Sequence, residues 1–160
     1  MLRATVLLLA TLAALNPISA VAQGEASSVL GCVSFDKLGC GCHIRVKRLA
    51  CTPAGSTSSV HFFTGLEQSE PLHLVLDGQP VELPHTARHG NSDKGDRSGR
   101  WVDEYSKGDL RVRISYTPGT STCPKSKEEP CEYTDYNATV TMVKHPSKPH
   151  LYRSTAKCGC

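Results

Sequence analysis

The sequence predicts an all-β fold, a small antiparallel barrel or sandwich of about seven or eight short strands that is rich in disulfides. Three observations lead to this prediction. Several short stretches alternate apolar and polar side chains, as expected of strands with one buried face. No stretch repeats apolar residues at the spacing of an amphipathic helix. The chain also contains eight cysteines, and an even number in an exported chain indicates a disulfide framework.

The N-terminal residues predict export. Arg3 supplies a positive charge, residues 4–15 are apolar, and Ala20-Val21-Ala22 resembles a signal-peptide cleavage site. The apolar run is shorter than the about 20 residues that a membrane-spanning helix needs. We therefore expect a protein that is periplasmic or secreted. Its expected parts are a signal peptide at residues 1–22, a flexible lead at 23–30 and a single disulfide-stapled β domain at 31–160.

The charge balance argues against several classes of partner. Without Arg3, the chain from Gln23 onward keeps 17 basic and 15 acidic residues, a net charge of +2. This excess is too small to indicate binding to nucleic acid or to an anionic membrane. No later stretch is apolar enough to span a bilayer. We therefore expect that the protein does not bind nucleic acid and does not span a membrane.

All the cysteines follow the expected signal peptide, and four of them form a repeated Cys-Gly-Cys tripeptide at 40–42 and 158–160. Each bridge can stabilise a fold by about 2–4 kcal/mol through restriction of the unfolded chain. Eight cysteines allow about 105 pairings, and the sequence does not choose among them. One bridge between Cys123 and Cys131, across the loop that holds both, is a first expectation. The cysteines expected in disulfides are Cys32, Cys40, Cys42, Cys51, Cys123, Cys131, Cys158 and Cys160.

The first half of the domain predicts four strands. In the first of them, Ile44 and Val46 share one face, and Arg45 and Lys47 share the other. Asp77-Gly78 between two apolar runs predicts a tight hairpin. The strands expected here span His43–Leu49, Val60–Phe63, Leu72–Asp77 and Val81–Leu83.

The second half predicts one long loop and three strands. The polar, glycine-bearing stretch Pro84–Arg100 shows no periodicity and is expected to be a loop. In Leu110–Tyr116, every second residue is apolar, so Leu110, Val112, Ile114 and Tyr116 should face the core. The same alternation in Tyr136–Val143 places Ala138, Val140 and Met142 inside. The last expected strand is Leu151–Ala156, which leads into the terminal Cys-Gly-Cys.

No catalytic motif stands out, so we expect a protein that is not an enzyme and that uses no cofactor or metal. The chain has no G-x-S-x-G nucleophile elbow, and every cysteine can be consumed by pairing. An alternative is a metal-binding or thiol-redox protein, since two Cys-Gly-Cys segments could supply thiolates to Zn or Cu(I). His85 and His89 have the four-residue spacing of a helical metal pair, but they fall in the expected loop.

One stretch resembles a known family. A strand, an Asp-Gly hairpin and a strand ending Leu83-Pro84 precede a loop with Ser98-Gly99 and then Tyr105-Ser106-Lys107-Gly108-Asp109. This order is similar to that of periplasmic lysozyme inhibitors. In them a β-barrel presents a serine loop and a lysine to the two catalytic carboxylates of lysozyme. The chain departs from the family in having Trp101 where tyrosine is usual, a shorter gap between serine and lysine, and more cysteines.

The resemblance implies a non-enzymatic, exported protein-binding domain, with a lysozyme-like protein or another cell-wall glycosidase as its partner. A glycosidase cleft presents paired carboxylates, which a hydroxyl and an ammonium group can bind. The residues implied in partner binding are Ser98, Gly99, Trp101, Tyr105 and Lys107. A third alternative is a structural surface protein without any site.

Overall fold

The structure of this chain is a computed structural model, and it describes residues 28–34, 39–51, 59–90, 99–120 and 133–159. The described residues form a nine-stranded antiparallel sheet in the order β6-β5-β4-β2-β11-β10-β9-β8-β7, and a separate pair, β1 and β3. The sheet curves into a nearly closed barrel. The all-β prediction is confirmed, and of its two forms the barrel is correct.

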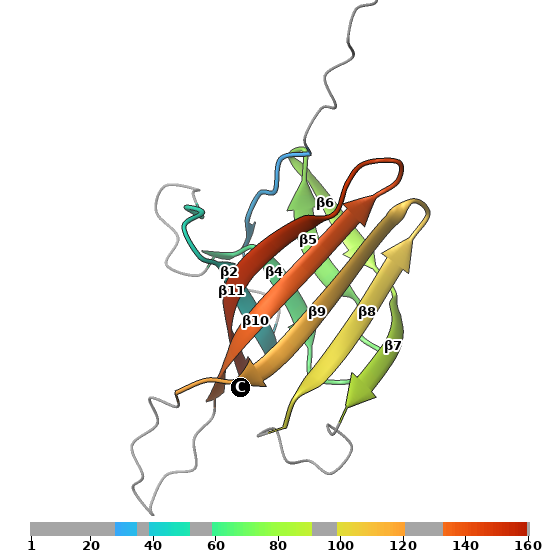
Figure 1. Ribbon diagram of the computed structural model, residues 1–160. Helices are drawn as coiled ribbons and strands as arrows, with labels where there is room; N and C mark the ends of the chain where they lie inside the picture. The colour runs from blue at the N-terminus through green and yellow to red at the C-terminus, as the bar shows by residue number, and fades with distance from the viewer. Residues whose placement is uncertain (1–27, 35–38, 52–58, 91–98, 121–132, 160) are drawn as a thin grey trace, which may run out of the picture.

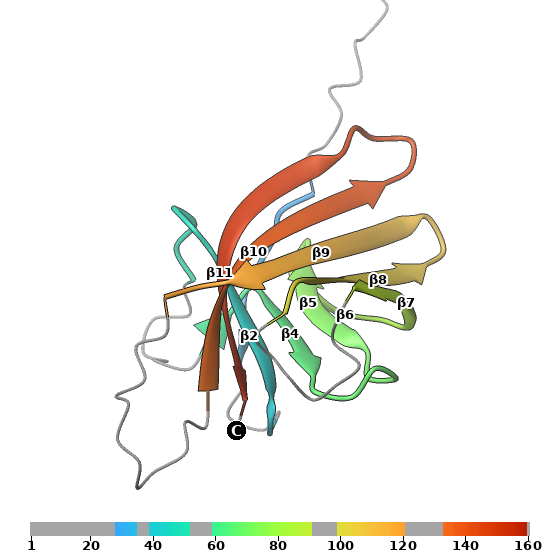
Figure 2. The same ribbon diagram turned by 60° about the horizontal axis from the view of Figure 1, so that its bottom comes forward.

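The strands are short at the start of the chain and long at its end. In Figures 1 and 2, β9 and β10 form one wall of the barrel, and β4, β5 and β6 form the wall opposite. The strands are β1 (Val33–Ser34), β2 (Gly41–Val46), β3 (Ser59–Val60), β4 (Phe62–Gly65), β5 (Leu72–Leu76), β6 (Gln79–Leu83), β7 (His85–Gly90), β8 (Trp101–Lys107), β9 (Leu110–Pro118), β10 (Tyr133–Lys144) and β11 (His150–Gly159).

The barrel closes where one extended segment changes partners at Pro84. The strands before and after this proline, β6 and β7, are the two edges of the sheet: β6 pairs with β5, and β7 pairs with β8. Pro84 has no N–H to give to a ladder, so it suits a point where pairing switches. Its carbonyl accepts a hydrogen bond from the Ser106 backbone N–H at 3.1 Å, which ties the join to β8.

The interior is filled by the inward residues of every strand. The predicted inward faces of β9 and β10 are confirmed: Val112, Ile114 and Val140 are at most 1% exposed. In β2, Ile44 and Val46 point inward and Arg45 outward, as predicted. The strands therefore pack by their two-residue alternation, and the barrel interior is a solid core.

The Asp77-Gly78 hairpin is also confirmed. Both residues have positive φ, 52° and 77°, which is the requirement of the two-residue turn that matches strand twist. The turn joins β5 directly to β6, with Leu76 opposite Gln79. It also receives the end of the expected N-terminal lead, because the Val29 N–H donates to Asp77 Oδ1 at 2.7 Å.

Two stretches differ from the sequence prediction. His85–Gly90, expected within a loop, is strand β7, and Trp101–Lys107 is strand β8, which the sequence analysis did not identify. Both strands carry polar residues on their inward faces, so their alternation of apolar and polar side chains is hidden. A β-bulge between His85 and Ala87 interrupts the period further. The expected strand at 60–63 is divided at His61 between β3 and β4.

Two disulfides are described, Cys32–Cys51 and Cys42–Cys158. Cys40 is disulfide-bonded too, and none of the cysteines in the described residues is free. Such bridges are typical of an oxidising environment outside the cytoplasm. The expected signal peptide and the expected Cys123–Cys131 bridge lie outside the described residues. No helix in the described part of the chain is long and apolar enough to cross a membrane.

Candidate functional site

Strand β8 and its neighbours contain most of the predicted partner-binding residues, and the structure places two of them in the core. Trp101 is 7% exposed and Tyr105 is 1% exposed. The Trp101 ring stacks on Tyr116 with centroids 4.4 Å apart and meets Tyr136 edge-on at 4.7 Å. Both predicted side chains therefore pack the barrel interior and are almost inaccessible to a partner.

Gly99 and Lys107 lie at opposite ends of β8. Gly99 precedes the strand, and Lys107 is its last residue, exposed beside the turn into β9. A seven-residue strand spans about 20 Å. The structure therefore does not bring this glycine and lysine together, and Ser98 lies outside the described residues.

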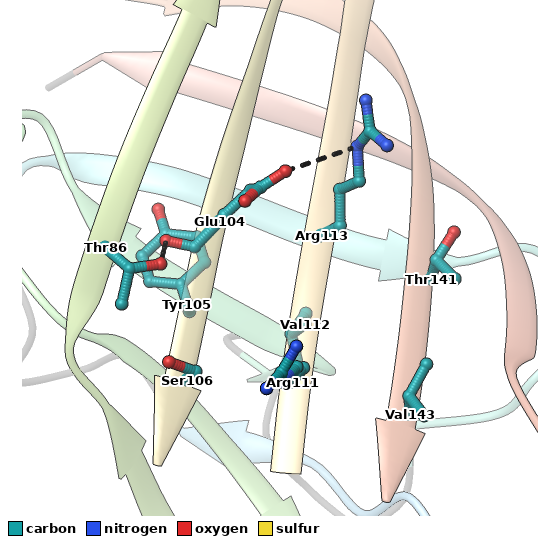
Figure 3. A pocket seen from close by; sticks show the side chains of 9 residues that line it. All are labelled: Thr86, Glu104, Tyr105, Ser106, Arg111, Val112, Arg113, Thr141 and Val143. Atoms are coloured by element: carbon teal, nitrogen blue, oxygen red, sulfur yellow. Dashed lines mark hydrogen bonds and ion pairs between the residues drawn. The ribbon is translucent and has the colours of Figure 1, made fainter.

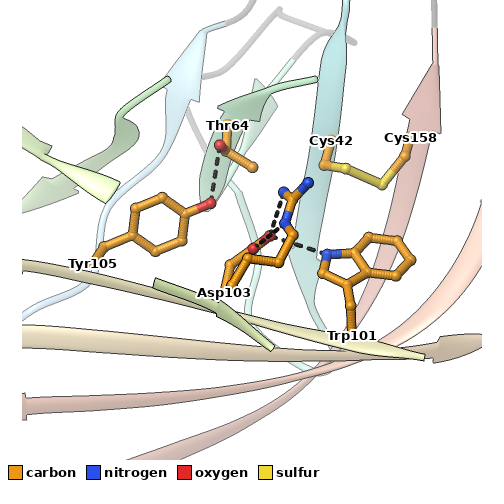
Figure 4. Close-up of a disulfide and its surroundings, with 7 residues drawn as sticks. Cys42, Thr64, Trp101, Asp103, Tyr105 and Cys158 are labelled. Carbon is orange, nitrogen blue, oxygen red and sulfur yellow. Dashed lines mark hydrogen bonds and ion pairs between the residues drawn. A yellow bond between two sulfur atoms is a disulfide. The ribbon is translucent and has the colours of Figure 1, made fainter. Parts of the chain in front are cut away.

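A buried carboxylate, Asp103, organises the interior beside Trp101 (Figure 4). Asp103 is 1% exposed. Arg88 donates to both of its oxygens, with Nη2 2.9 Å from Oδ2, and Trp101 Nε1 donates to Oδ2 at 3.0 Å. His85 Nε2 lies 3.4 Å from Oδ1. Each oxygen has donors, so the pairing suits a structural ion pair and leaves the carboxylate no free position for acid–base chemistry.

Burial and charge both act on this cluster. Burial lowers the pKa of Arg88, but the hydrogen bond and the charge of Asp103 outweigh it and raise that pKa. Burial, together with the charge of Asp103, raises the pKa of Tyr105 well above its usual value. Its hydroxyl lies 3.1 Å from Thr64 Oγ1. Arg88 therefore stays charged and Tyr105 stays neutral at physiological pH.

The described residues of the two Cys-Gly-Cys segments lie side by side in the adjacent antiparallel strands β2 and β11. Gly41 is opposite Gly159, and Cys42 is opposite Cys158. The Cys42–Cys158 bridge is buried in the core, with exposures of 6% and 2%. At Gly41 a Cβ atom would lie 2.6 Å from the Phe63 ring and 2.4 Å from the Thr64 carbonyl oxygen, so only glycine fits. In this oxidised state the bridge offers no thiolate to a metal.

The histidine pair at the expected metal spacing is separated by the barrel wall. His85 points inward to Asp103, whereas His89 is 61% exposed and lies 3.9 Å from Glu104. The β-bulge after His85 causes this change of face. The two imidazoles therefore do not share a site.

The outer face of β8, β9 and β10 carries a groove that the sequence analysis did not identify (Figure 3). It has a volume of about 350 Å³. Arg113 Nε lies 3.8 Å from Glu104 Oε1, with both side chains well exposed. Arg111 is exposed and has no ion-pair partner among the described residues. The lining residues are Thr86, Glu104, Tyr105, Ser106, Arg111, Val112, Arg113, Thr141 and Val143.

The groove brings cations and hydroxyl groups together on the outer surface of the sheet. Ser106 and Arg111 are register partners across the β8–β9 ladder, and Lys107 follows Ser106 at the turn. The one carboxylate of the groove, Glu104, stands beside Arg113, so the cations outnumber the acid. The alternation Arg111-Val112-Arg113 was the available signal, because it predicts two arginines on one outward face.

Comparison with known protein families, characterised proteins and solved structures found no match to this chain.

Proposed function

We propose that this chain is an exported, non-enzymatic protein-binding domain that uses the groove on β8, β9 and β10 to hold acidic side chains of a partner. The observation that supports this proposal is the pair of outward arginines, Arg111 and Arg113, beside Lys107 and opposed by one carboxylate. The proposed location is the periplasm or the medium outside the cell, with residues 1–22 as the signal peptide.

The chemistry of the groove suits carboxylates. A guanidinium presents several donors in a fixed plane and binds a carboxylate through two parallel hydrogen bonds. Strand positions hold the two arginines at a fixed spacing, so less conformational entropy is lost on binding than in a loop. The hydroxyl groups of Ser106 and Thr86 line the same groove. Ser106 adds a further donor, whereas Thr86 already donates its hydroxyl hydrogen to the Glu104 carbonyl oxygen at 2.9 Å.

A lysozyme or another cell-wall glycosidase is the partner that we propose. Its active site presents two carboxylates a few ångströms apart in a cleft. The exposed β8–β9 turn has Lys107 at its start, so it places a cation next to the groove. This arrangement supplies the lysine that the resemblance implies, and Ser106 and Arg111 supply the hydrogen-bond donors that the resemblance assigns to Ser98.

The test is inhibition of a panel of lysozymes of different structural types by the chain from Gln23 onward. We expect inhibition that weakens by about tenfold or more in Arg111→Ala/Arg113→Ala, since hydrogen bonds to charged groups contribute about 1.5–3 kcal/mol each. Lys107→Ala should weaken it as well. Lys157→Ala, an exposed cation elsewhere on the outer surface, is the matched control and should change little.

Two outcomes would count against the proposal. Absence of inhibition of every lysozyme would remove the glycosidase as the partner. If Ser98→Ala abolished inhibition while the double arginine variant kept it, the binding surface would include Ser98 and not the groove. Circular dichroism of each variant should show an unchanged β spectrum, so that loss of binding is separated from loss of fold.

A further inference from the structure

The Cys32–Cys51 disulfide lies against a buried histidine on the wall of the barrel. Strand β1 pairs with β3 so that Val33 is opposite Val60, and the next positions in this register are Cys32 and His61. One ring nitrogen of His61 and the two sulfur atoms all lie within 4.8 Å of one another. Neither the partner-binding groove nor the buried Asp103 cluster includes this group.

The hydrogen bonds of His61 fix where its proton sits. His61 is 1% exposed. Its Nδ1 accepts a hydrogen bond from the Val46 backbone N–H at 3.1 Å. A neutral imidazole that accepts at Nδ1 carries its proton on Nε2. Nε2 is buried and has no hydrogen-bond partner among the described residues. The ring therefore holds a buried N–H donor without an acceptor.

The ring is also kept neutral. Burial, and to a smaller degree the charge of Arg45, lowers the pKa of His61. A buried donor without an acceptor costs free energy comparable to a lost hydrogen bond. An anion that formed beside Nε2 would restore that hydrogen bond.

The two described disulfides differ in access. Cys42 and Cys158 are buried in the core, whereas Cys32 and Cys51 are only half-buried. Thiol–disulfide exchange requires a thiolate to reach one of the sulfur atoms, so access controls its rate. Of the two described bridges, Cys32–Cys51 is therefore the more accessible to a small external thiol.

We propose that Cys32–Cys51 is a reversible modification site for low-molecular-weight thiols, with His61 as a positioning residue that donates its Nε2–H to the departing sulfur. An external thiolate attacks one sulfur, the S–S bond breaks, and its electron pair leaves with the other sulfur as a thiolate. A second external thiol attacks the mixed disulfide. Two thiols are oxidised to one disulfide, and the protein gains two cysteine thiols.

The same three groups do not favour a metal site. Two thiolates and an imidazole suit Zn or Cu(I), but a metal needs a free lone pair on the ring nitrogen. Nδ1 is occupied by the Val46 N–H, and Nε2 carries the proton. The geometry therefore fits a donor to a thiolate better than a ligand to a cation.

The first experiment treats the folded wild-type protein with reduced glutathione, traps thiols by alkylation at set times and maps them by mass spectrometry. We expect Cys32 and Cys51 to be labelled at least about tenfold faster than Cys42 and Cys158, with an unchanged circular-dichroism spectrum. Labelling of both pairs at one rate, or of Cys42 and Cys158 first, would overturn the proposal.

The second experiment tests the donor through two variants. His61→Asn keeps an acceptor near the Nδ1 position and loses the donor at the Nε2 position, whereas His61→Gln can keep a donor there. We expect reduction of the bridge to slow about tenfold in the Asn variant and to recover in part in the Gln variant. An Asn variant that is folded and reduced at the wild-type rate would contradict the role of His61.

The third measurement tests for a metal site at the reduced cysteines, and it uses the wild-type protein so that the result does not depend on the folding of a variant. It titrates the wild-type protein, reduced only at Cys32–Cys51, with Zn²⁺. Tight one-to-one uptake that alkylation of these two cysteines prevents would replace the thiol proposal. Absence of uptake, with return of the bridge under oxidised glutathione, would support it.

Discussion

The two faces of the β8–β9 hairpin come from the same stretch of sequence, but charged side chains are buried and paired on one face and exposed to water on the other. On the inner face, Asp103 is 1% exposed, and donors from Arg88 and Trp101 satisfy it. On the outer face, Glu104 stands 3.8 Å from Arg113, and both side chains remain in water. The comparison shows that the face of the strand, more than the residue type, decides whether a charge stabilises the fold or is free to bind.

The energetic reason is desolvation. A charge inside the barrel has lost its water, so it must be paired, and removal of one partner leaves the other uncompensated. A charge outside the barrel keeps its water, and an exposed ion pair contributes at most about 1 kcal/mol. Asp103 and Glu104 are adjacent in the sequence, one buried and one exposed, so they provide a matched pair for testing how burial changes the contribution of a charge to stability.

The largest expected effect is that of Asp103→Ala. The substitution leaves the Arg88 guanidinium, whose side chain is only 15% exposed, without its carboxylate, and we expect it to lower the free energy of unfolding by about 3–5 kcal/mol. Glu104→Ala, one residue away on the outer face, should change it by less than about 1 kcal/mol. Urea denaturation measures both. Equal losses in the two variants would contradict the comparison.

A smaller effect is expected from the buried tyrosine hydroxyls. Tyr105→Phe removes the hydrogen-bond partner of Thr64 Oγ1, and we expect a loss of about 1 kcal/mol in stability. The Tyr116 hydroxyl is buried without a hydrogen-bond partner among the described residues. Tyr116→Phe should therefore be neutral or stabilising, because it removes an unsatisfied polar group. Denaturation curves that show the reverse order would break this part of the comparison.

Buried and exposed groups should also differ in their response to pH. Burial lowers the pKa of His61. Below about pH 6.5 this histidine therefore binds a proton more readily in the unfolded chain than in the folded chain. Stability should be independent of this group above that pH and should fall as the pH drops below it. His61→Asn should reduce the fall, although the part due to His43, whose pKa burial also lowers, remains. Unfolding curves at pH 7.5 and pH 5.5 measure the difference, and an unchanged fall would contradict it.

The smallest effect on stability is expected at the outer arginines. Arg111→Ala should change the free energy of unfolding by less than about 0.5 kcal/mol, since it is an exposed substitution without a described ion pair. The same variant should weaken binding to an acidic partner, which isothermal titration calorimetry would measure. A large loss of stability would show that Arg111 supports the barrel and would remove it from the binding surface.

Much of the fold could be predicted where a single strand shows its own pattern. Alternation in Leu110–Tyr116 and the Asp77-Gly78 turn are local features, and the structure has both. Strands β7 and β8 could not be predicted in this way, because Asp103 and Arg88 replace apolar residues on their inner faces. These two residues are tolerated inside only because they meet, and that meeting depends on the pairing of β7 with β8.

The candidate site was less predictable than the fold. The alternation Arg111-Val112-Arg113 indicated two outward arginines, but the groove between them and Glu104 depends on the order of β8, β9 and β10. Trp101 and Tyr105 were expected to contact a partner and are buried in the core. Aromatic residues occur both at binding surfaces and in barrel interiors, so the sequence alone could not tell which of these places Trp101 and Tyr105 occupy.

The sequence by itself determined an all-β, antiparallel chain with a disulfide framework, since the two-residue period and the cysteine count are properties of the residues in order. Only the tertiary structure decided that Cys42 joins Cys158 across 116 residues, that Gly99 and Lys107 end up at opposite ends of β8, and that His61 lies against Cys32–Cys51. Each of these depends on the register between strands that are distant in the chain. A register is selected by the packing of the whole barrel, which no single segment contains.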